Sequence, residues 1–501
     1  MKKGLPLLLL ASLLVISCSN NKSIVSSANK ETSSTFSSYE SSPSYKSSSK
    51  VVSSSSRQTS SVQVSSSNKT SSSEQAPKDV TPLEGCYFLD FKSILMSDDK
   101  GQQLEFKINI PYDYLAFNHD SKTFKKELAV ATIPFAINAP MLDKITDVFD
   151  AFGFDDYMIS EEYNQEETAT TMKYFFGHKK IDNYDVINLT LSGYMYNKPW
   201  ENNFDIGLTG NHAGFQAMAY KLLPSVISYL NKYKTATNLK VYMNGYSRSA
   251  AVGNLLSTIL IDNKLVSEEN LYTYLFETPC GIDTANTKEY KSIFNIINKA
   301  DIITYVSPKE YGHIRVGQDV EIYKDNYQQI LNEFDPRIVV PQYAVNNGCN
   351  DDAEFIKYLI DTLLAPVENV EEGKPSIDIS TRANFVNNLQ SDFGYVMSII
   401  WEIPNEAIEA LKAKVSGMSL TEMLGLLQED ALYNEIKPIF DEYHVNYDAT
   451  KLRTLLNKVP VALQQKASLL AIALSEDVRN DVLRTVYFHT VETVVPLLLA
   501  L

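Results

Sequence analysis

Residues 240–253, KVYMNGYSRSAAVG, are the stretch that decides the fold. The first residues are typical of a short strand, and the small residues from Ser249 onward favour a helix. A strand that passes through Gly245-Tyr246-Ser247-Arg248-Ser249 directly into a helix is the setting of a nucleophile elbow, which holds a serine at the carboxyl edge of a sheet. Ser249 stands where that motif has its last glycine, and serine is small enough for the turn. Ser247 is therefore a candidate nucleophile; the alternative is a plain turn in which Ser247 caps a helix.

The segments around this stretch alternate between strand patterns and helix patterns. Residues 184–191, 271–276 and 293–297 have the apolar character of buried strands, whereas residues 212–233 and 249–260 have helical spacing or composition. Strands that alternate with helices predict an α/β fold in which helices flank a mostly parallel sheet.

The N-terminal part of the chain differs from the rest. A basic start and an apolar run that ends at Cys18 predict an export signal over residues 1–18, in which Cys18 is lipidated and becomes the mature N-terminus. An ordinary cleaved signal with an incidental cysteine is the alternative. Residues 19–77 are rich in serine and poor in large apolar residues, so we expect a disordered tether there.

The body, residues 78–501, is acidic and long enough for a full core. Residues 1–77 carry a formal charge of +5 and the body about −21, which argues against a nucleic-acid partner because phosphates would be repelled. From about residue 320 the pattern becomes helical, which predicts a helical insertion, a cap or lid, over about 322–480.

The cysteines and short motifs indicate no metal site. Cys86, Cys280 and Cys349 remain in the body, an odd number with no metal or disulfide spacing, so one bridge is possible but its members are not determined. Metal-binding and phosphate-loop motifs are absent from the sequence, and we expect neither a cofactor nor a metal.

Several short segments follow one another in an order that is informative as a set: Leu191–Tyr194, Asn211–Phe215, Gly245–Ser249, Phe276–Gly281 and Asn298–Pro308. Together they resemble the class 3 lipases of the α/β-hydrolase fold, over roughly residues 140–320 and a short C-terminal piece. The resemblance implies a serine hydrolase with a triad in the chain order nucleophile, acid, histidine.

The resemblance implies that Asp301 is the acid of the triad, with Asp283 as a competing carboxylate. Chain order then removes the histidines that precede Ser247 and leaves His313, His444 and His489. His489 lies near the end of the chain, where the family places its base, so we assign it that role. Thr490 could cap the helix that follows.

An oxyanion hole needs two backbone N–H groups. Arg248, directly after the nucleophile, is expected to provide one, and by resemblance Tyr194 provides the other. Ser192 and Tyr194 replace the family's arginine and hydroxyl residue in that turn, which is the weakest part of the likeness.

These expectations describe a lipase or esterase that cleaves carboxylic esters of acylglycerols, other lipids or small molecules. Its lipid anchor would hold it on the extracytoplasmic face of a bacterial membrane. A peptidase or thioesterase on the same fold is one alternative, and a non-catalytic surface lipoprotein for binding or adhesion is another. A substrate-binding lipoprotein of a transporter would not explain the elbow.

Overall fold

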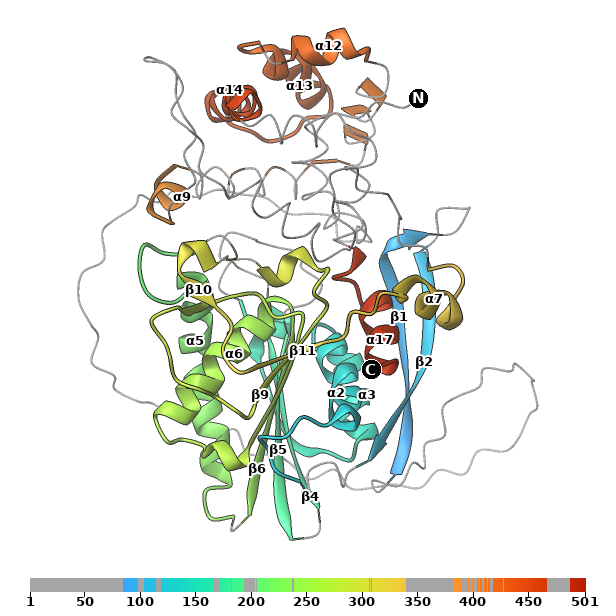
Figure 1. Cartoon of the computed structure of the whole chain (residues 1–501), viewed down its shortest axis with the longest axis vertical. Helices are drawn as coiled ribbons and strands as arrows, with labels where there is room; N and C mark the ends of the chain where they lie inside the picture. Colours follow the sequence, from blue (N-terminus) through green and yellow to red (C-terminus); the bar gives the residue numbers. More distant parts are fainter. Residues whose placement is uncertain are drawn as a thin grey trace, which may run out of the picture. The chain divides into compact units, whose positions relative to one another are not determined.

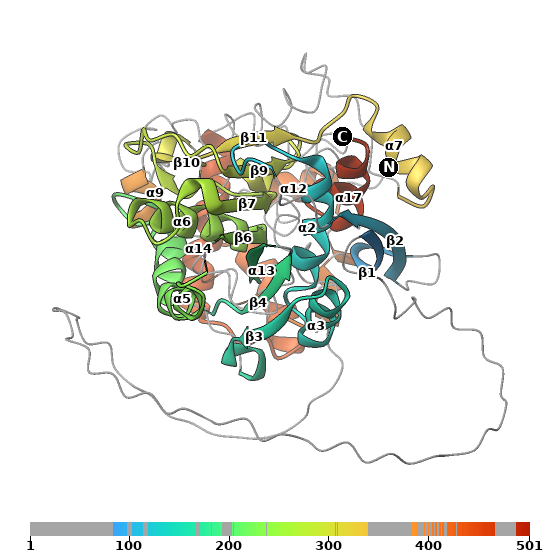
Figure 2. The same cartoon turned by 90° about the horizontal axis from the view of Figure 1, so that it is seen from below.

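The computed structural model contains a seven-stranded sheet with helices on both faces (Figures 1 and 2). The strand order is β11-β9-β7-β6-β5-β4-β3, and the five strands from β11 to β5 run parallel, whereas β4 and β3 are antiparallel. This sheet confirms the predicted α/β-hydrolase-like class. The residues that the structure describes are 84–97, 103–113, 119–165, 171–181, 183–192, 203, 205–236, 238–305, 307, 309–338, 382–388, 395, 399, 403–404, 406–407, 410–411, 413–414, 418–426, 428–465 and 487–501.

The predicted strands and helices of the sheet region agree with the structure to within a few residues. The strands are β1 Glu84–Ser97, β2 Gln103–Asp113, β3 Asp155–Ile159, β4 Tyr174–Ile181, β5 Tyr184–Leu191, β6 Leu239–Tyr246, β7 Leu271–Phe276, β8 Ile282–Asp283, β9 Ile293–Ile297, β10 His313–Ile314 and β11 Gln318–Glu321. The helices are α2 Lys126–Asn138, α3 Leu142–Ala151, α5 Ala213–Lys232, α6 Arg248–Asp262, α7 Tyr327–Phe334, α9 Arg382–Asn388, α12 Leu420–Gly425, α13 Ala431–Glu442, α14 Ala449–Gln465 and α17 Val491–Leu499.

The central strands are buried on both faces, and their side chains alternate between two cores. On β6, Val241 and Met243 belong to the core beneath α5 and α6, whereas Tyr242 and Tyr246 belong to the core that contains α2 and α17. On β7, successive residues divide between the same two cores. Burial on both sides explains why these strands are near-continuous apolar runs rather than alternating ones.

The N-terminal hairpin and the C-terminal helix join the second of these cores. β1 and β2 pair antiparallel, and Leu89 and Phe106 pack into the same cluster as α2 and α17. The hydroxyl of Ser93 on β1 donates a hydrogen bond to the buried carboxyl group of Glu492 on α17. The end of the chain is therefore anchored beside the sheet, which matters for the position of His489.

Residues from 395 to 465 contain α12, α13 and α14 and have an apolar cluster of their own, which includes Leu432, Ile436, Phe440 and Leu452. These helices lie within the interval 322–480, for which the sequence predicts a helical insertion. The proposed boundaries of the leader, linker and body stay predictions.

Some features of the sequence lie outside the described residues, namely Cys18, the serine-rich linker and Cys349. Within the described part, neither Cys86 nor Cys280 takes part in a disulfide bond. None of the helices in that part combines the length and apolar character needed to cross a membrane.

Candidate active site

The site forms where three parallel strands end at one edge of the sheet. β6, β7 and β9 are neighbours in register, with Tyr246 opposite Phe276 and Phe276 opposite Ile296. Ser247 follows β6, Glu277 follows β7, and Asp301 lies a few residues beyond β9. Parallel strands bring their carboxyl ends to the same edge, so the three side chains meet there.

Ser247 lies in a strained turn between β6 and α6. Its φ is +59°, a left-handed value that is uncommon for a residue with a Cβ. The backbone N–H of Ser247 donates to the carbonyl of Phe276 at 2.9 Å, which ties the turn to β7. Ser247 is the N-cap residue of α6, but its hydroxyl makes no capping hydrogen bond. The turn is therefore a sharp strand-to-helix elbow in its backbone geometry, and Ser247 does not act as an ordinary serine cap.

Gly245 and Ser249 make this turn possible. A Cβ added at Gly245 would lie 2.9 Å from backbone and side-chain atoms of Ser249, closer than real contacts allow. The hydroxyl of Ser249 donates to the carbonyl of Tyr246 and accepts from its N–H, both at 2.9 Å. Serine in place of the motif's last glycine therefore adds hydrogen bonds within the elbow.

His489 lies just before α17. Packing of the preceding residue, Phe488, and a hydrogen bond from Tyr246 hold its loop in place. Phe488 is fully buried and packs against Tyr323 and Tyr327. The hydroxyl of Tyr246 donates to the backbone carbonyl of His489 at 2.8 Å. Tyr246, which belongs to the elbow, therefore also holds the loop that carries His489.

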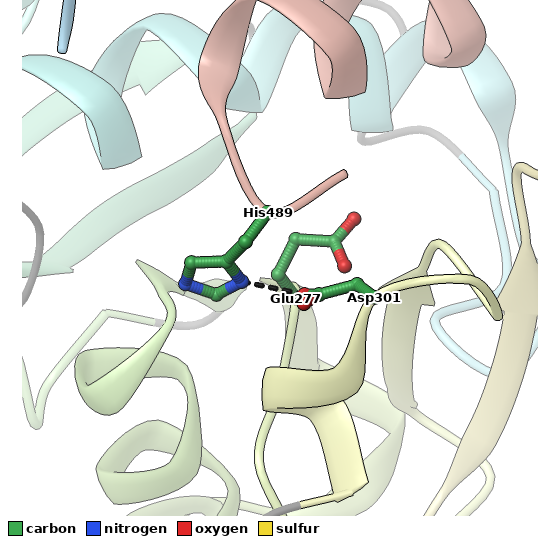
Figure 3. Close-up of side chains that lie close together, drawn as sticks. All are labelled: Glu277, Asp301 and His489. Atoms are coloured by element: carbon green, nitrogen blue, oxygen red, sulfur yellow. Dashed lines mark hydrogen bonds and ion pairs between the residues drawn. The ribbon is translucent and has the colours of Figure 1, made fainter. Parts of the chain in front are cut away.

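The ring of His489 connects Ser247 to Asp301. Nε2 lies 2.8 Å from Ser247 Oγ, and Nδ1 lies 2.5 Å from Asp301 Oδ2 (Figure 3 shows the contact with Asp301). The Asp301 side chain is fully buried, whereas that of His489 is 16% exposed. The N–H of Ile303 donates to Asp301 Oδ1 at 2.9 Å, which fixes the carboxylate from its other side. A carboxylate on Nδ1 favours the tautomer whose Nε2 can accept a proton.

Glu277 is a second buried carboxyl group in this site. Both of its carboxyl oxygens accept the N–H of Asn298, at 3.1 and 3.2 Å. Burial, the negative charge of Asp301 and a hydrogen bond with the Asp301 side chain raise the pKa of Glu277 well above its ordinary value.

Glu277, Asp301 and His489 are also the residues of the described part that could together hold a metal ion, because one ligand atom from each lies within 4.8 Å of the others. However, the Nδ1 and Oδ2 atoms are only 2.5 Å apart, which is a hydrogen-bond distance and leaves no room for an ion between them. We therefore interpret the cluster as a hydrogen-bonded chain.

The other candidate histidines do not occupy this position. His313 is buried on β10 and lies beside His212, with ring centroids 5.7 Å apart. His444 is exposed just after α13. His212 caps α5 by accepting the N–H of Phe215 and contacts the Asn203 carbonyl through Nε2 at 3.1 Å, so it stabilises the start of that helix.

The competing carboxylate, Asp283, has a local role. Its N–H donates to the side chain of Asn211 at 2.8 Å, and its carboxylate accepts the N–H of Ala285 at 2.8 Å. It therefore stabilises the turn around β8, opposite His313 in the short β8–β10 ladder.

The oxyanion roles of Arg248 and Tyr194 both stay predictions, but the structure describes the position of Arg248. Arg248 is the first residue of α6, so its backbone N–H lies at the positive end of a helix directly after Ser247. Tyr194 lies outside the described residues, so its prediction stays open.

Thr490 is the N-cap residue of α17, as its position suggested, but its hydroxyl donates to the Tyr487 carbonyl and makes no capping bond.

Sequence reasoning missed Tyr246 and Glu277. Both stand inside motifs that the sequence makes visible, the elbow and the turn after residues 271–276. An acidic residue at the end of a buried strand, next to the strand that carries the nucleophile, is the signal that could have identified Glu277.

Residues 163–311 match the family model described as Lipase (class 3). The matching segment is class 3 lipase-like. It contains Ser247, Glu277 and Asp301 but ends before His489. A comparison with curated proteins gave no match.

Similar solved structures are also lipases. The lipase from Rhizopus microsporus var. chinensis is 17% identical, with a TM-score of 0.33, over 40% of this chain and 75% of the other. The Rhizomucor miehei triacylglyceride lipase is 18% identical, with a TM-score of 0.33, over 41% and 83% of the two chains. The native propeptide complex of the Rhizomucor miehei lipase is 16% identical, with the same TM-score, over 41% and 71%.

Proposed function

We propose that the protein is a lipase-type serine hydrolase that cleaves carboxylic esters with Ser247 as nucleophile, His489 as base and Asp301 as the acid that orients it. The observation that carries the proposal is the His489 ring, which contacts Ser247 Oγ at 2.8 Å and Asp301 Oδ2 at 2.5 Å. The family match of residues 163–311 supports an ester as substrate.

In the first half of the reaction, His489 Nε2 takes the proton of the Ser247 hydroxyl as its oxygen attacks the ester carbonyl. The carboxylate of Asp301 stabilises the imidazolium that results. The negative charge on the former carbonyl oxygen is held by backbone N–H groups, for which we propose Arg248 and Tyr194. His489 then gives the proton to the leaving alcohol.

In the second half, His489 removes a proton from water as its oxygen attacks the acyl carbon. The bond to Ser247 Oγ then breaks, His489 returns the proton to that oxygen, and the carboxylic acid is released. The buried environment of Asp301 strengthens its interaction with His489 because little water screens it. The chain's own side chains carry every proton transfer of this scheme.

A fluorophosphonate probe tests the assignment of the nucleophile. We expect the parent protein to be labelled and to hydrolyse p-nitrophenyl esters, and we expect Ser247→Ala to lose both. Equal hydrolysis by Ser247→Ala would exclude the mechanism. A parent protein that is never labelled would instead indicate a binding protein, and preference for peptide or thioester substrates would indicate a different hydrolase.

We also propose that the enzyme is anchored in a bacterial membrane by lipid on Cys18, with the serine-rich linker as a tether on the extracytoplasmic side. Acyl chains contribute about 0.8 kcal/mol per buried methylene group, so two or more chains give stable attachment. Expression of Cys18→Ser in a bacterial host tests this. We expect the variant to lose lipid labelling and to leave the membrane fraction, whereas unchanged membrane association would argue against the anchor.

A further inference from the structure

A buried glutamate lies next to the acid of the proposed triad. Glu277 and Asp301 are both fully buried, and their carboxyl oxygens lie within 4.8 Å of each other and of a His489 ring nitrogen. Figure 3 shows the side chains of Glu277, Asp301 and His489 close together. The hydrolysis scheme above makes no use of Glu277.

Two buried carboxyl groups at this distance do not both ionise readily, because the negative charge of Asp301 raises the pKa of Glu277. Asp301 is the better site for the charge. It accepts a hydrogen bond from Ile303 N–H and faces the Nδ1 of His489, which becomes cationic during the reaction. The proton therefore remains on the second carboxyl group, that of Glu277.

The charged groups around Glu277 agree with this distribution. Asp301 raises the pKa of Glu277, as does burial, whereas the positive charge of Arg315 lowers it less strongly. The Arg315 guanidinium has other partners: it forms an ion pair with Asp319 at 2.9 Å and donates a hydrogen bond to the Thr278 carbonyl at 3.1 Å. His489 faces Glu277 from the loop before α17.

The backbone at Glu277 shows that this residue is held in place. Its φ is +49°, which a residue with a Cβ adopts at an energetic cost. Its N–H donates to the Ile296 carbonyl of β9 at 2.9 Å, and its carboxyl group accepts from Asn298. These contacts to β9 and the loop after it keep the Glu277 side chain beside Asp301.

We propose that Glu277 is a positioning residue, which stays protonated, donates its carboxyl hydrogen to Asp301 and so holds a single negative charge in the orientation that His489 needs. The active site would then be a chain of four groups, Ser247, His489, Asp301 and Glu277. This inference rests on the proposed function.

Two variants separate a protonated positioning residue from a merely space-filling one. Glu277→Gln keeps the shape and an N–H donor without a charge, and Glu277→Leu has a similar volume but no donor. We expect Glu277→Gln to keep kcat within about threefold, and Glu277→Leu to lower kcat roughly tenfold or more with little change in KM, because a hydrogen bond to a charged group is lost. Equal activity of the Leu variant and the parent would overturn the proposal.

The pH profile tests the proton directly. If Glu277 is protonated in the parent, Glu277→Gln changes no charge, and the acidic limb of kcat/KM stays where it is. If Glu277 is ionised, the substitution removes a negative charge beside His489, and the acidic limb moves to lower pH by about one unit or more. That shift would overturn the proposal even if the Leu variant does not fold.

A measurement without substrate keeps this test independent of the proposed function. NMR titration of the histidine rings in the full chain, with His489→Gln to assign the signal, gives the midpoint for His489 in the parent and in Glu277→Gln. Equal midpoints support a protonated Glu277, and a lower midpoint in the Gln variant contradicts it. Full ester hydrolysis by Ser247→Ala would defeat the proposed function but would leave this titration interpretable.

Discussion

Two regions of the molecule differ in where their charged side chains lie. One is the sheet edge that carries Ser247, and the other is the helical segment from residue 395 to 465. At the sheet edge, Glu277 and Asp301 are fully buried and hydrogen-bonded. In the helical segment the buried cluster is apolar, and charged groups such as Arg453 and Asp430 pair near the surface. Burying polar groups is costly unless each finds a partner. The buried carboxyl groups at the edge therefore support the proposal that the chemistry takes place there, whereas apolar packing holds the helical segment.

This difference in the burial of charged groups indicates where substitutions should affect activity. A buried polar group in a low-dielectric site acts strongly on its neighbours, whereas an exposed ion pair is screened by water. Substitutions at the sheet edge should therefore change activity or its pH dependence, and polar substitutions on the surface of the helical segment should not.

The largest effect is expected for Ser247→Ala, which removes the nucleophile. We expect kcat for ester hydrolysis to fall by a factor on the order of 10⁵ or more, measured with p-nitrophenyl esters. Ser225→Ala, on α5, is the matched control and should keep the activity of the parent. Residual activity above one tenth of the parent would mean that another group attacks the ester.

Asp301→Asn should have the next largest effect. The amide is similar in shape but removes the charge and favours the wrong tautomer of His489, so we expect kcat to fall by about 10³-fold to 10⁴-fold. Asp283→Asn, the matched control in the β8 turn, should fall far less. If the two variants exchanged these results, Asp283 and not Asp301 would be the acid.

The buried His212 predicts how stability depends on pH. Burial lowers the pKa of His212 from about 6.5 to about 3, with a further contribution from His313. The unfolded chain therefore binds more protons, so stability is present above about pH 6.5 and is lost as the pH falls toward 3. We expect His212→Asn to reduce the slope of unfolding free energy against pH by about one proton in this range, as measured by urea unfolding.

His444→Asn, in the helical segment, is the control for that experiment. His444 is exposed, and its φ of +54° is a conformation that asparagine tolerates. The slope should stay unchanged in this variant. Equal slopes for the parent and the His212 variant would show that His212 does not contribute to acid unfolding.

Tyr246→Phe tests the link between the elbow and the histidine loop. The variant loses the hydrogen bond to the His489 carbonyl, a contribution of about 1 kcal/mol, so we expect kcat to fall by roughly fivefold with KM little changed. Tyr272→Phe, which removes a hydroxyl from β7 that faces the His119 carbonyl, is a suitable control. Unchanged kcat in Tyr246→Phe would mean that packing alone holds the loop.

The smallest effect is expected for Arg453→Gln in the helical segment. The Arg453–Asp430 pair lies near the surface, where water screens the attraction. Ester hydrolysis and fluorophosphonate labelling should match those of the parent. A large loss of activity would show that the helical segment affects catalysis through its charges and would remove the contrast between the two regions.

Much of the sheet region could be predicted from the sequence, because its signals are local. The strands β5, β7 and β9 coincide with the predicted ranges, and α5 begins and ends within a residue of its prediction. Apolar runs and helical spacing act over a few residues, so they do not depend on distant parts of the chain. The elbow at Ser247 is equally local, since it needs only small residues at Gly245 and Ser249.

The candidate site was less predictable. Chain order left three histidines, and only resemblance to a family favoured His489. His489 is 188 residues from Asp301 and 242 from Ser247, and no local pattern encodes a contact over such a distance.

The strand β11 was also missed, because a four-residue strand at the edge of the sheet has a weak pattern of its own.

The sequence by itself determined the alternation of strands and helices, the elbow and the candidate nucleophile, and its resemblance to a family implied the acid. Only the tertiary structure decided which histidine meets them and placed Glu277 beside Asp301. The physical reason is that propensity and periodicity depend on neighbours along the chain, whereas burial and the partner of a charge depend on which segments pack together. The choice of His489 and the proposed proton on Glu277 follow from that packing.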